Sequence, residues 1–155
     1  MLLLTFGVSG CRYGVDVRCI VEVVPRIPLR PIPHAPPFVA GLFNHGGIVV
    51  PVIDLGQLLD GRACVARLST RVILVDYPAT GKGAEFLGLV AEDVTDLRVV
   101  RDSQVSAQPT PPPTAPYLGP ILQVGEELVQ IIVIERLLPD DLRETLFGGM
   151  LGLPS

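Results

Sequence analysis

The residues whose chemistry could support catalysis are few and lie far apart in the sequence. His34 lies in a proline-rich stretch and His45 in a glycine-rich turn, and no serine or cysteine nucleophile stands near either one in sequence. A catalytic triad could still assemble in three dimensions, but nothing in the spacing predicts it. Gly81-Lys82-Gly83 carries a lysine between two predicted strands and lacks the rest of a phosphate-binding loop, so we interpret it as a hairpin loop.

Four carboxylates complete the candidates for acid–base or metal chemistry. Glu92, Asp93 and Asp96 form a small acidic group, but a divalent cation usually recruits more oxygen ligands than these three offer, so we interpret the group as a solvated strand end. Asp54 directly follows an apolar run and is better placed to cap a helix than to act as an acid or base. The sequence therefore predicts no catalytic residue, no metal and no cofactor.

The chain shows no sign of export or membrane insertion. Residues 1–8 are apolar but too short to span a bilayer, and they lack the leading positive charge and cleavage site of a secretory signal. No longer apolar region runs uninterrupted, so no transmembrane helix is predicted. Cys11, Cys19 and Cys64 are an odd number with no close pair, which argues against a disulfide framework or a zinc site and predicts buried free thiols. We expect a cytoplasmic protein.

The composition fits a single domain, or two small subdomains that share one core. The 155 residues are 48% apolar and only 18% charged, and the mean hydropathy is +0.49. This high apolar content means either a large core or an apolar surface that a partner covers, and the composition does not distinguish between the two. The net charge of −4 and the isoelectric point of about 5.1 provide no cationic face for a phosphate backbone, which argues against nucleic-acid binding.

Short apolar runs separated by turn residues indicate a protein built mainly of strands. Residues 17–21 fit either a strand or a short helical turn capped by Asp16. A bend is expected at Glu92-Asp93, and a loop at residues 78–83. About ten short strands with little helix predict an all-β barrel or sandwich. The runs predicted as strands are residues 2–8, 12–15, 38–43, 47–53, 70–77, 86–91, 94–100, 117–124 and 128–134.

Two proline-rich segments and one helix account for most of the remaining chain. Residues 25–37 hold six prolines and are predicted to run as an extended surface arm, and residues 109–116 form a stiff linker or a strap. Leu138, Leu142 and Leu146 recur with a helical period, which predicts a short amphipathic helix over residues 139–147. This helix either plugs one end of a barrel or faces a partner.

The most informative segment is residues 41–55, which joins a tight turn to a buried strand. Asn44 to Gly47 supply residues that tolerate positive φ, and residues 48–53 form a β-branched run interrupted by Pro51. A proline cannot donate to a strand ladder, so its position suggests an edge strand or a bulge. The segment carries no catalytic group, and it indicates an architecture for binding.

This segment and several others resemble the CheW family, the coupling proteins that join chemoreceptors to a histidine kinase in bacterial signalling arrays. The resemblance covers residues 3–138, which is nearly the whole chain. The matching positions are Gly41, Asn44, Gly47, Pro51, Val52, Asp54 and Leu55 in the central motif, Ile20 to Val23 before it together with residues 13–17 and 33–39, and Gly88, Leu89, Val90, Val94 and residues 135–138 after it.

The resemblance implies two packed five-stranded β-barrels with a short C-terminal helix, within one domain over residues 1–147. It places the first barrel at about residues 14–68 and the second at 69–135, with terminal strands exchanged, and it leaves residues 148–155 as a flexible tail. It also implies a non-catalytic adaptor that binds the regulatory domain of a CheA-type histidine kinase and the cytoplasmic tip of a methyl-accepting chemoreceptor. Such a protein is cytoplasmic and associates with membrane-bound receptor arrays without inserting into the membrane.

The same resemblance implies two partner-binding sets. The receptor tip would lie in an apolar groove between the barrels, and the kinase would contact the strand at residues 48–53 and its turn. The implied residues are Ile20, Glu22 and Gly41 for the receptor, and Asn44, Gly46, Gly47, Val50 and Pro51 for the kinase.

The chain departs from the family pattern inside the turn. Where the family usually has Leu-Arg-Gly after the asparagine, this chain has His45-Gly46-Gly47, so the charged donor of the arginine is absent. Glu92 also replaces an aspartate, and Ile132-Val133 replaces a late Leu-Asp. Residues 67–77 and 115–120 look most like WspB-type coupling proteins of surface-sensing Wsp systems, in which receptor and kinase control a diguanylate cyclase. A divergent coupling protein is expected, serving either flagellar chemotaxis or surface sensing.

Two other classes of function stay open on the sequence alone. A small-molecule-binding β-barrel sensor would need a closed apolar cavity with a few convergent polar groups, and a sequence does not reveal such a cavity. A hydrolase would use His34 or His45, although no substrate follows from the residues around them.

Overall fold

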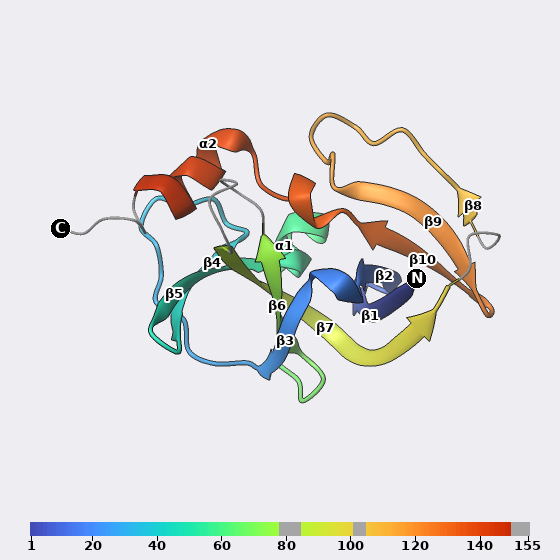
Figure 1. Ribbon diagram of the computed structural model, residues 1–155, viewed down its shortest axis with the longest axis horizontal. Coiled ribbons are helices and arrows are strands. Elements are labelled where there is room, and N and C mark those ends of the chain that lie inside the picture. The colour runs from blue at the N-terminus through green and yellow to red at the C-terminus, as the bar shows by residue number, and fades with distance from the viewer. Residues whose placement is uncertain (78–84, 101–104, 150–155) are drawn as a thin grey trace.

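The computed structural model describes residues 1–77, 85–100 and 105–149, which form a β-rich fold with short helical segments (Figure 1). The predicted all-β class with a short C-terminal helix is confirmed. The strands are β1 (Leu2–Val8), β2 (Cys11–Asp16), β3 (Ile20–Pro25), β4 (Val39–His45), β5 (Ile48–Asp54), β6 (Arg71–Tyr77), β7 (Glu85–Val99), β8 (Val105–Ala107), β9 (Leu118–Val124) and β10 (Glu127–Ile132). The helical segments are η1 (Val17–Cys19), α1 (Leu55–Asp60), η3 (Ile134–Arg136), α2 (Asp140–Arg143) and η4 (Glu144–Gly149).

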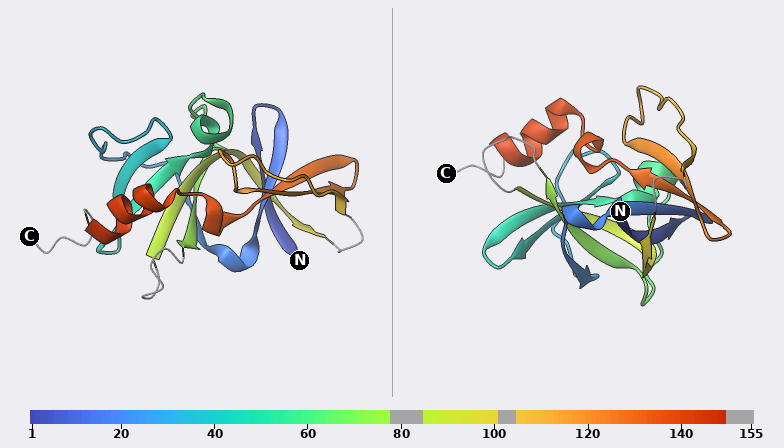
Figure 2. Two further views of the ribbon diagram at one scale, coloured as in Figure 1. Left: turned by 90° about the horizontal axis from the view of Figure 1, so that it is seen from above. Right: turned by 45° about the vertical axis from the view of Figure 1, so that its right-hand side comes forward.

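Two curled sheets share the long strand β7. The first half of β7 pairs with β5 and β6, and these strands continue the first sheet to β4 and β3. The second half of β7 pairs with β1, and the second sheet continues through β2, β10 and β9 to β8. Figures 1 and 2 show β8, β9 and β10 at one end of the molecule, with β4, β5 and the C-terminal helix at the other.

Strand β7 differs from the sequence prediction because it is one strand where two were expected. The bend at Glu92-Asp93 is present, since Asp93 has a φ of +48° and the register of β1 against β7 shifts beside it, but the strand continues through the bend. The hydrogen bonding passes from the first sheet to the second within β7. Strand β6, which follows residue 69, pairs with β3 in the first sheet.

Two further segments bear on the predicted strand list. The short strand β8 was not predicted, because three residues carry too little periodicity to be recognised. The loop predicted at residues 78–83 lies outside the described residues.

Three clusters of apolar side chains hold the sheets together. The largest takes residues from both sheets, while the other two lie within the first and the second sheet respectively. Strand β6 illustrates the arrangement, since Ile73 and Val75 join the shared cluster while Val72 and Leu74 join the cluster of the first sheet. A strand that is buried on both faces shows little alternation of apolar and polar residues, which explains the continuous apolar run at residues 72–75.

Local chemistry sets the predicted turns and caps. The Asp54 carboxylate accepts a hydrogen bond of 3.1 Å from the Gln57 N–H and caps α1, as predicted. Asp16 caps η1 in the same way, and the chain then continues into β3, so both alternatives for residues 17–21 are realised in succession. Pro51 does not mark an edge strand, because β5 lies between β4 and β7; it stands just before the pairing with β7 begins at Val52.

The proline-rich arm was predicted at residues 25–37, and it has no regular structure after Pro25, which ends β3. The arm is hydrogen-bonded to β4. Arg30 and Leu42 exchange two backbone hydrogen bonds of 2.8 Å. Gly41, the residue next to Leu42, has a φ of +147°, and a Cβ built on it would lie 2.6 Å from the carbonyl oxygen of Arg30. The close approach of the arm therefore requires glycine at position 41.

The C-terminal helix begins at Asp140, close to the predicted start, and its last turn is a π-helix. Leu146 and Phe147 are buried in the shared cluster, where Phe147 stacks on Tyr77 with ring centroids 5.7 Å apart. The Tyr77 hydroxyl accepts a hydrogen bond of 3.3 Å from the Leu138 N–H. The helix therefore covers the core, as in the first of its two predicted roles. Of the predicted tail, residues 148 and 149 belong to η4 and the remainder lies outside the described residues.

The cysteines are less buried than predicted. Cys11 is exposed, because it begins β2 beside a surface turn, and Cys19 and Cys64 are only partly buried. Burial, with a smaller contribution from the nearby Asp54 carboxylate, raises the pKa of Cys64 to about 12. The three thiols are therefore free but differ in chemical environment.

Replacing Gly41 should destabilise the fold itself. We expect Gly41→Ala to lower the free energy of unfolding by about 2–4 kcal/mol, because the new Cβ would collide with the Arg30 carbonyl in a backbone region that disfavours side chains. Denaturant titration measures the loss. Gly46→Ala is the matched control: its φ of +60° costs about 1–2 kcal/mol, but no atom lies within 4 Å of its Cβ. If the two variants lost equal free energy of unfolding, the arm would have moved away from the new Cβ at position 41, which would contradict the expected collision.

Alkylation should distinguish the thiols by their protonation. At pH 8 a thiol whose pKa is about 12 is ionised to only about one part in ten thousand, so Cys64 should react with iodoacetamide at least about 100-fold more slowly than the exposed Cys11. Peptide mass spectrometry over time gives the separate rates. Because the raised pKa keeps the thiol neutral, the Cys64 rate should rise about tenfold between pH 8 and pH 9. A Cys64 rate equal to that of Cys11 would contradict the assigned environment.

Candidate functional site

The turn between β4 and β5 projects into solvent and carries three of the residues predicted to contact the kinase. Asn44, Gly46 and Gly47 are all exposed. Gly46 and Gly47 adopt φ values of +60° and +90°, and the Gly47 N–H donates a hydrogen bond of 2.8 Å to Asn44 Oδ1. A side-chain amide that accepts from the backbone two or three residues later stabilises a tight turn. The shape of this turn is therefore determined by its own sequence.

Strand β5 changes from exposed to buried just after the turn. Ile48 and Val49 are 49% and 47% exposed, whereas Val50 is fully buried in the first-sheet cluster and Pro51 is also buried. Val50 and Pro51 can act on a partner only by shaping the strand. The side chains available for contact at this end of β5 are those of Ile48 and Val49, which the site prediction did not name.

Strand β3 carries two of the three residues predicted to contact the receptor. It pairs only with β6 in the described part of the chain, so its other edge has no partner strand there. The pairing shifts between Ile20 and Glu22, which leaves Glu22 exposed and Ile20 half-buried against the shared cluster. Val21 and Val23, the neighbours of Glu22 in sequence, are also exposed, so β3 carries both apolar side chains and a carboxylate at the surface.

The structure does not bring the third predicted receptor residue to the surface. Gly41 is buried, and the space where its side chain would extend is filled by the arm at Arg30. In the structure this glycine lets the arm cross β4, and its predicted contact with the receptor stays a prediction. Of the three residues predicted to contact the receptor, the exposed Glu22 and the half-buried Ile20 lie on β3, and Gly41 lies beneath the arm.

One contact links β3 to the hairpin of β4 and β5. His45 Nε2 lies 3.2 Å from Glu22 Oε2, which makes an ion pair when the imidazole is protonated. The Phe43 ring meets the His45 ring edge-on at 5.9 Å and holds it at the rim of the first-sheet cluster. The site prediction did not include His45. The sequence marked His45 only as a candidate catalytic histidine and as the replacement of the usual leucine in the turn motif.

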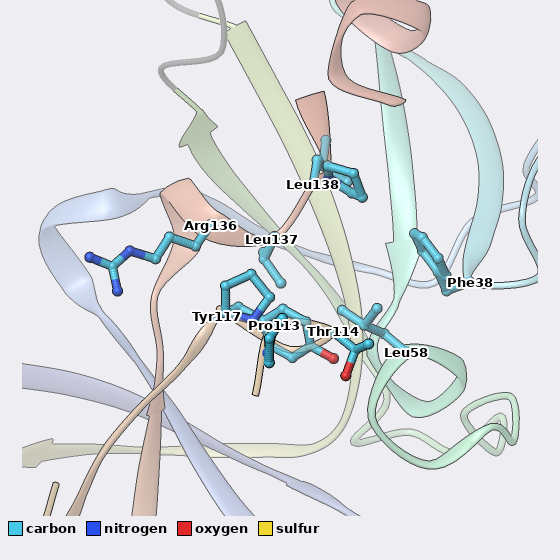
Figure 3. A pocket seen from close by; sticks show the side chains of 10 residues that line it. Phe38, Leu58, Pro113, Thr114, Tyr117, Arg136, Leu137 and Leu138 are labelled. Carbon is cyan, nitrogen blue, oxygen red and sulfur yellow. The ribbon is translucent and has the colours of Figure 1, made fainter. Parts of the chain in front are cut away.

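A separate recess lies where the arm, α1, the second proline-rich segment and the residues after β10 meet (Figure 3). Its cavity volume is about 310 Å³, and Phe38, Leu58, Tyr117, Leu137 and Leu138 supply most of its apolar wall. The Arg136 side chain points away from the other labelled residues, and burial raises the pKa of Tyr117. This recess lies between chain segments and not inside a barrel, so it is not the enclosed cavity that the sensor hypothesis requires.

Within residues 1–77, 85–100 and 105–149, no three histidine, cysteine, aspartate or glutamate side chains gather where they could hold a metal ion. Over the same residues, no helix has the length and apolar character needed to cross a bilayer.

Comparison with known proteins agrees with this architecture. The chain is 24% identical over 146 residues to the chemotaxis protein CheW of Rhizobium meliloti, covering 92% of this chain and 90% of the relative. It is 29% identical over 140 residues to protein FrzA of Myxococcus xanthus, covering 86% and 82% of the two chains. The crystal structure of the scaffolding protein TtCheW from Thermoanaerobacter tengcongensis has the same fold, with a TM-score of 0.77 at 24% identity over 89% of this chain and 87% of that one.

The family model of the CheW-like domain matches residues 2–142, which include every strand of both sheets. The chain therefore belongs to the family of CheW-like domain proteins.

Proposed function

We propose that the protein is a non-catalytic adaptor that couples a methyl-accepting chemoreceptor to a CheA-type histidine kinase in a bacterial chemosensory array. The observation that carries this proposal is the CheW-like domain over residues 2–142, which occupies almost the whole described chain. The relatives named as chemotaxis proteins and the neighbour named as a scaffolding protein support the same function. Because the CheW family consists of adaptors, chemistry on a substrate is not part of the proposal.

The proposed kinase contact is the turn of β4 and β5. Asn44, Gly46 and Gly47 shape it, and the exposed side chains of Ile48 and Val49 add apolar area beside it. An exposed pair of β-branched residues at the end of a rigid hairpin suits end-on docking, because little conformational entropy is lost when rigid side chains are buried. Val50 and Pro51 contribute by holding the strand in place from below.

The proposed receptor contact is β3, through Ile20 and Glu22. The unpaired edge of β3 and its exposed Val21 and Val23 support this assignment, because a receptor helix needs an apolar wall with some charge for orientation. Gly41 has an indirect part, since it lets the arm lie against β4. The two proposed surfaces therefore lie on the same sheet.

An adaptor of this kind acts by shifting populations. It alters kinase activity only to the extent that it binds the active and inactive arrangements of its partners with different affinities. A domain whose two sheets share one strand and one core transmits such a difference as a nearly rigid body. We place it in the cytoplasm, beside membrane-bound receptors.

The finer assignment is to the WspB-type branch, in which the array senses surfaces and controls a diguanylate cyclase. Residues 67–77 and 115–120 support it by their resemblance to that branch. In the structure these segments form β6 with the turn before it, and the end of the second proline-rich segment leading into β9.

Kinase binding tests the adaptor function directly. We expect the full chain to bind the regulatory domain of the histidine kinase encoded beside it with one-to-one stoichiometry and micromolar affinity, measured by isothermal titration. Val49→Asp should weaken that binding at least tenfold, about 1.4 kcal/mol, because it places a charge in an apolar contact. Its cost in stability should stay within about 1 kcal/mol, since the side chain is half exposed.

The matched control for this experiment is Val65→Asp. Val65 is also an exposed valine, but it lies in the loop between α1 and β6, away from the turn. It should bind the kinase domain like the wild type. Absence of binding by the wild-type protein would refute the kinase-coupling function, and equal losses for the two variants would move the contact away from the β4–β5 turn.

A further inference from the structure

The first sheet has a seam between β3 and β4. Each of these strands ends the sheet on its own side, and no strand ladder joins them in the described part of the chain. Two contacts connect β4 to the chain on the other side of this gap. The arm holds Leu42 through its paired backbone hydrogen bonds with Arg30, and Glu22 of β3 holds His45 through its carboxylate. The second contact is made by side chains alone, so a partner can displace it without breaking the backbone structure.

The geometry makes the His45–Glu22 contact accessible from outside. The side chains of His45 and Glu22 are 34% and 51% exposed, and they meet at 3.2 Å. His45 is the last residue of β4 and faces Ile48 across the turn, in the register that joins the two strands. Glu22 lies between the exposed residues Val21 and Val23. Each partner of the contact thus belongs to one of the two proposed docking surfaces.

We propose that the His45–Glu22 pair is a clasp that couples the two docking surfaces, so that a receptor occupying Glu22 weakens binding at the β4–β5 turn. This inference rests on the proposed adaptor function. The receptor surface it requires offers Glu22 a lysine or an arginine, because a stronger cation takes the carboxylate from the imidazole. His45 then loses the contact that ties the turn to β3. His45 is a positioning residue, which acts on both partners through Glu22.

The expected size of the coupling follows from the exposure of the pair. Ion pairs at the protein surface typically change an equilibrium about 1.5- to 5-fold, because water and salt screen them. By linkage, the receptor should weaken kinase binding by the same factor as the kinase weakens receptor binding. The clasp therefore adjusts the array contacts and does not switch them on or off.

The first test measures this linkage by isothermal titration. The full chain is titrated with the regulatory domain of the neighbouring kinase, alone and then saturated with the cytoplasmic tip fragment of the neighbouring receptor. We expect the receptor fragment to weaken kinase binding about 1.5- to 5-fold in the wild type. His45→Leu should remove the effect, and His45→Lys should restore it because an ammonium group can also hold the Glu22 carboxylate. His34→Leu, a histidine replaced in the exposed arm, should leave it intact.

A wild type without coupling, or coupling that survives His45→Leu, would overturn the proposal. If neither partner binds, the adaptor function is refuted. A second measurement, which needs no partner, then tests whether the His45–Glu22 contact holds the turn. Hydrogen exchange of the turn amides at residues 45–49 should speed up about 1.5- to 5-fold in Glu22→Gln and not in Glu126→Gln, an exposed glutamate of the β9–β10 turn. Unchanged exchange in Glu22→Gln would show that no clasp exists.

Discussion

The continuous strand β7 is the constraint on which the rest of the structure depends. Its first half belongs to the first sheet and its second half to the second, so neither sheet can turn without bending the strand they share. The bend at Asp93 gives each sheet its own curvature, and the shared apolar cluster then fills the space between them. The C-terminal helix closes this cluster with Leu146 and Phe147. The two halves therefore form one mechanical unit, which suits a protein whose task is to hold partners in a fixed geometry.

The sequence predicted those features whose causes are local. Asn44 and the glycines after it form a turn by themselves, and Asp54 caps the helix that follows it. The leucines of residues 138–146 recur with the period of the helix that they form. The continuity of β7 was not predictable, because two adjacent acidic residues, Glu92 and Asp93, are typical of a break between strands. In the structure Asp93 adopts a positive φ and the strand continues through it. The burial of Gly41 was not predictable either, since it depends on Arg30, eleven positions earlier, crossing β4. The burial of Gly41 thus depends on a contact between segments that are distant along the chain, whereas β8 was missed because it is too short to show a period.

The unusual hydropathy of the chain has two structural sources. Part of the apolar surplus fills a core with three clusters, in which strands such as β6 are covered on both faces. Another part remains on the surface at Ile48, Val49, Val21 and Val23, next to the turn and along the edge of β3. The two alternatives left open by composition are thus both present. The part on the first sheet coincides with the proposed docking surfaces. Further exposed apolar side chains lie on the second sheet, at Leu2, Leu97, Val99 and Leu128.

The departure from the family pattern in the turn replaces the arginine with glycine and places an imidazole ring one residue earlier. The family arginine would stand at Gly46, whose Cβ position faces open space, whereas His45 beside it points back to Glu22 and rests against Phe43. The flexible, permanently charged arginine of the family is thereby replaced by the shorter imidazole of His45, which contacts Glu22 and Phe43. The turn can then be a glycine pair with less side-chain bulk toward a partner, while the carboxylate of β3 retains a neighbour that can carry positive charge. A divergent partner surface, matched to a flatter turn, is the natural counterpart of this exchange.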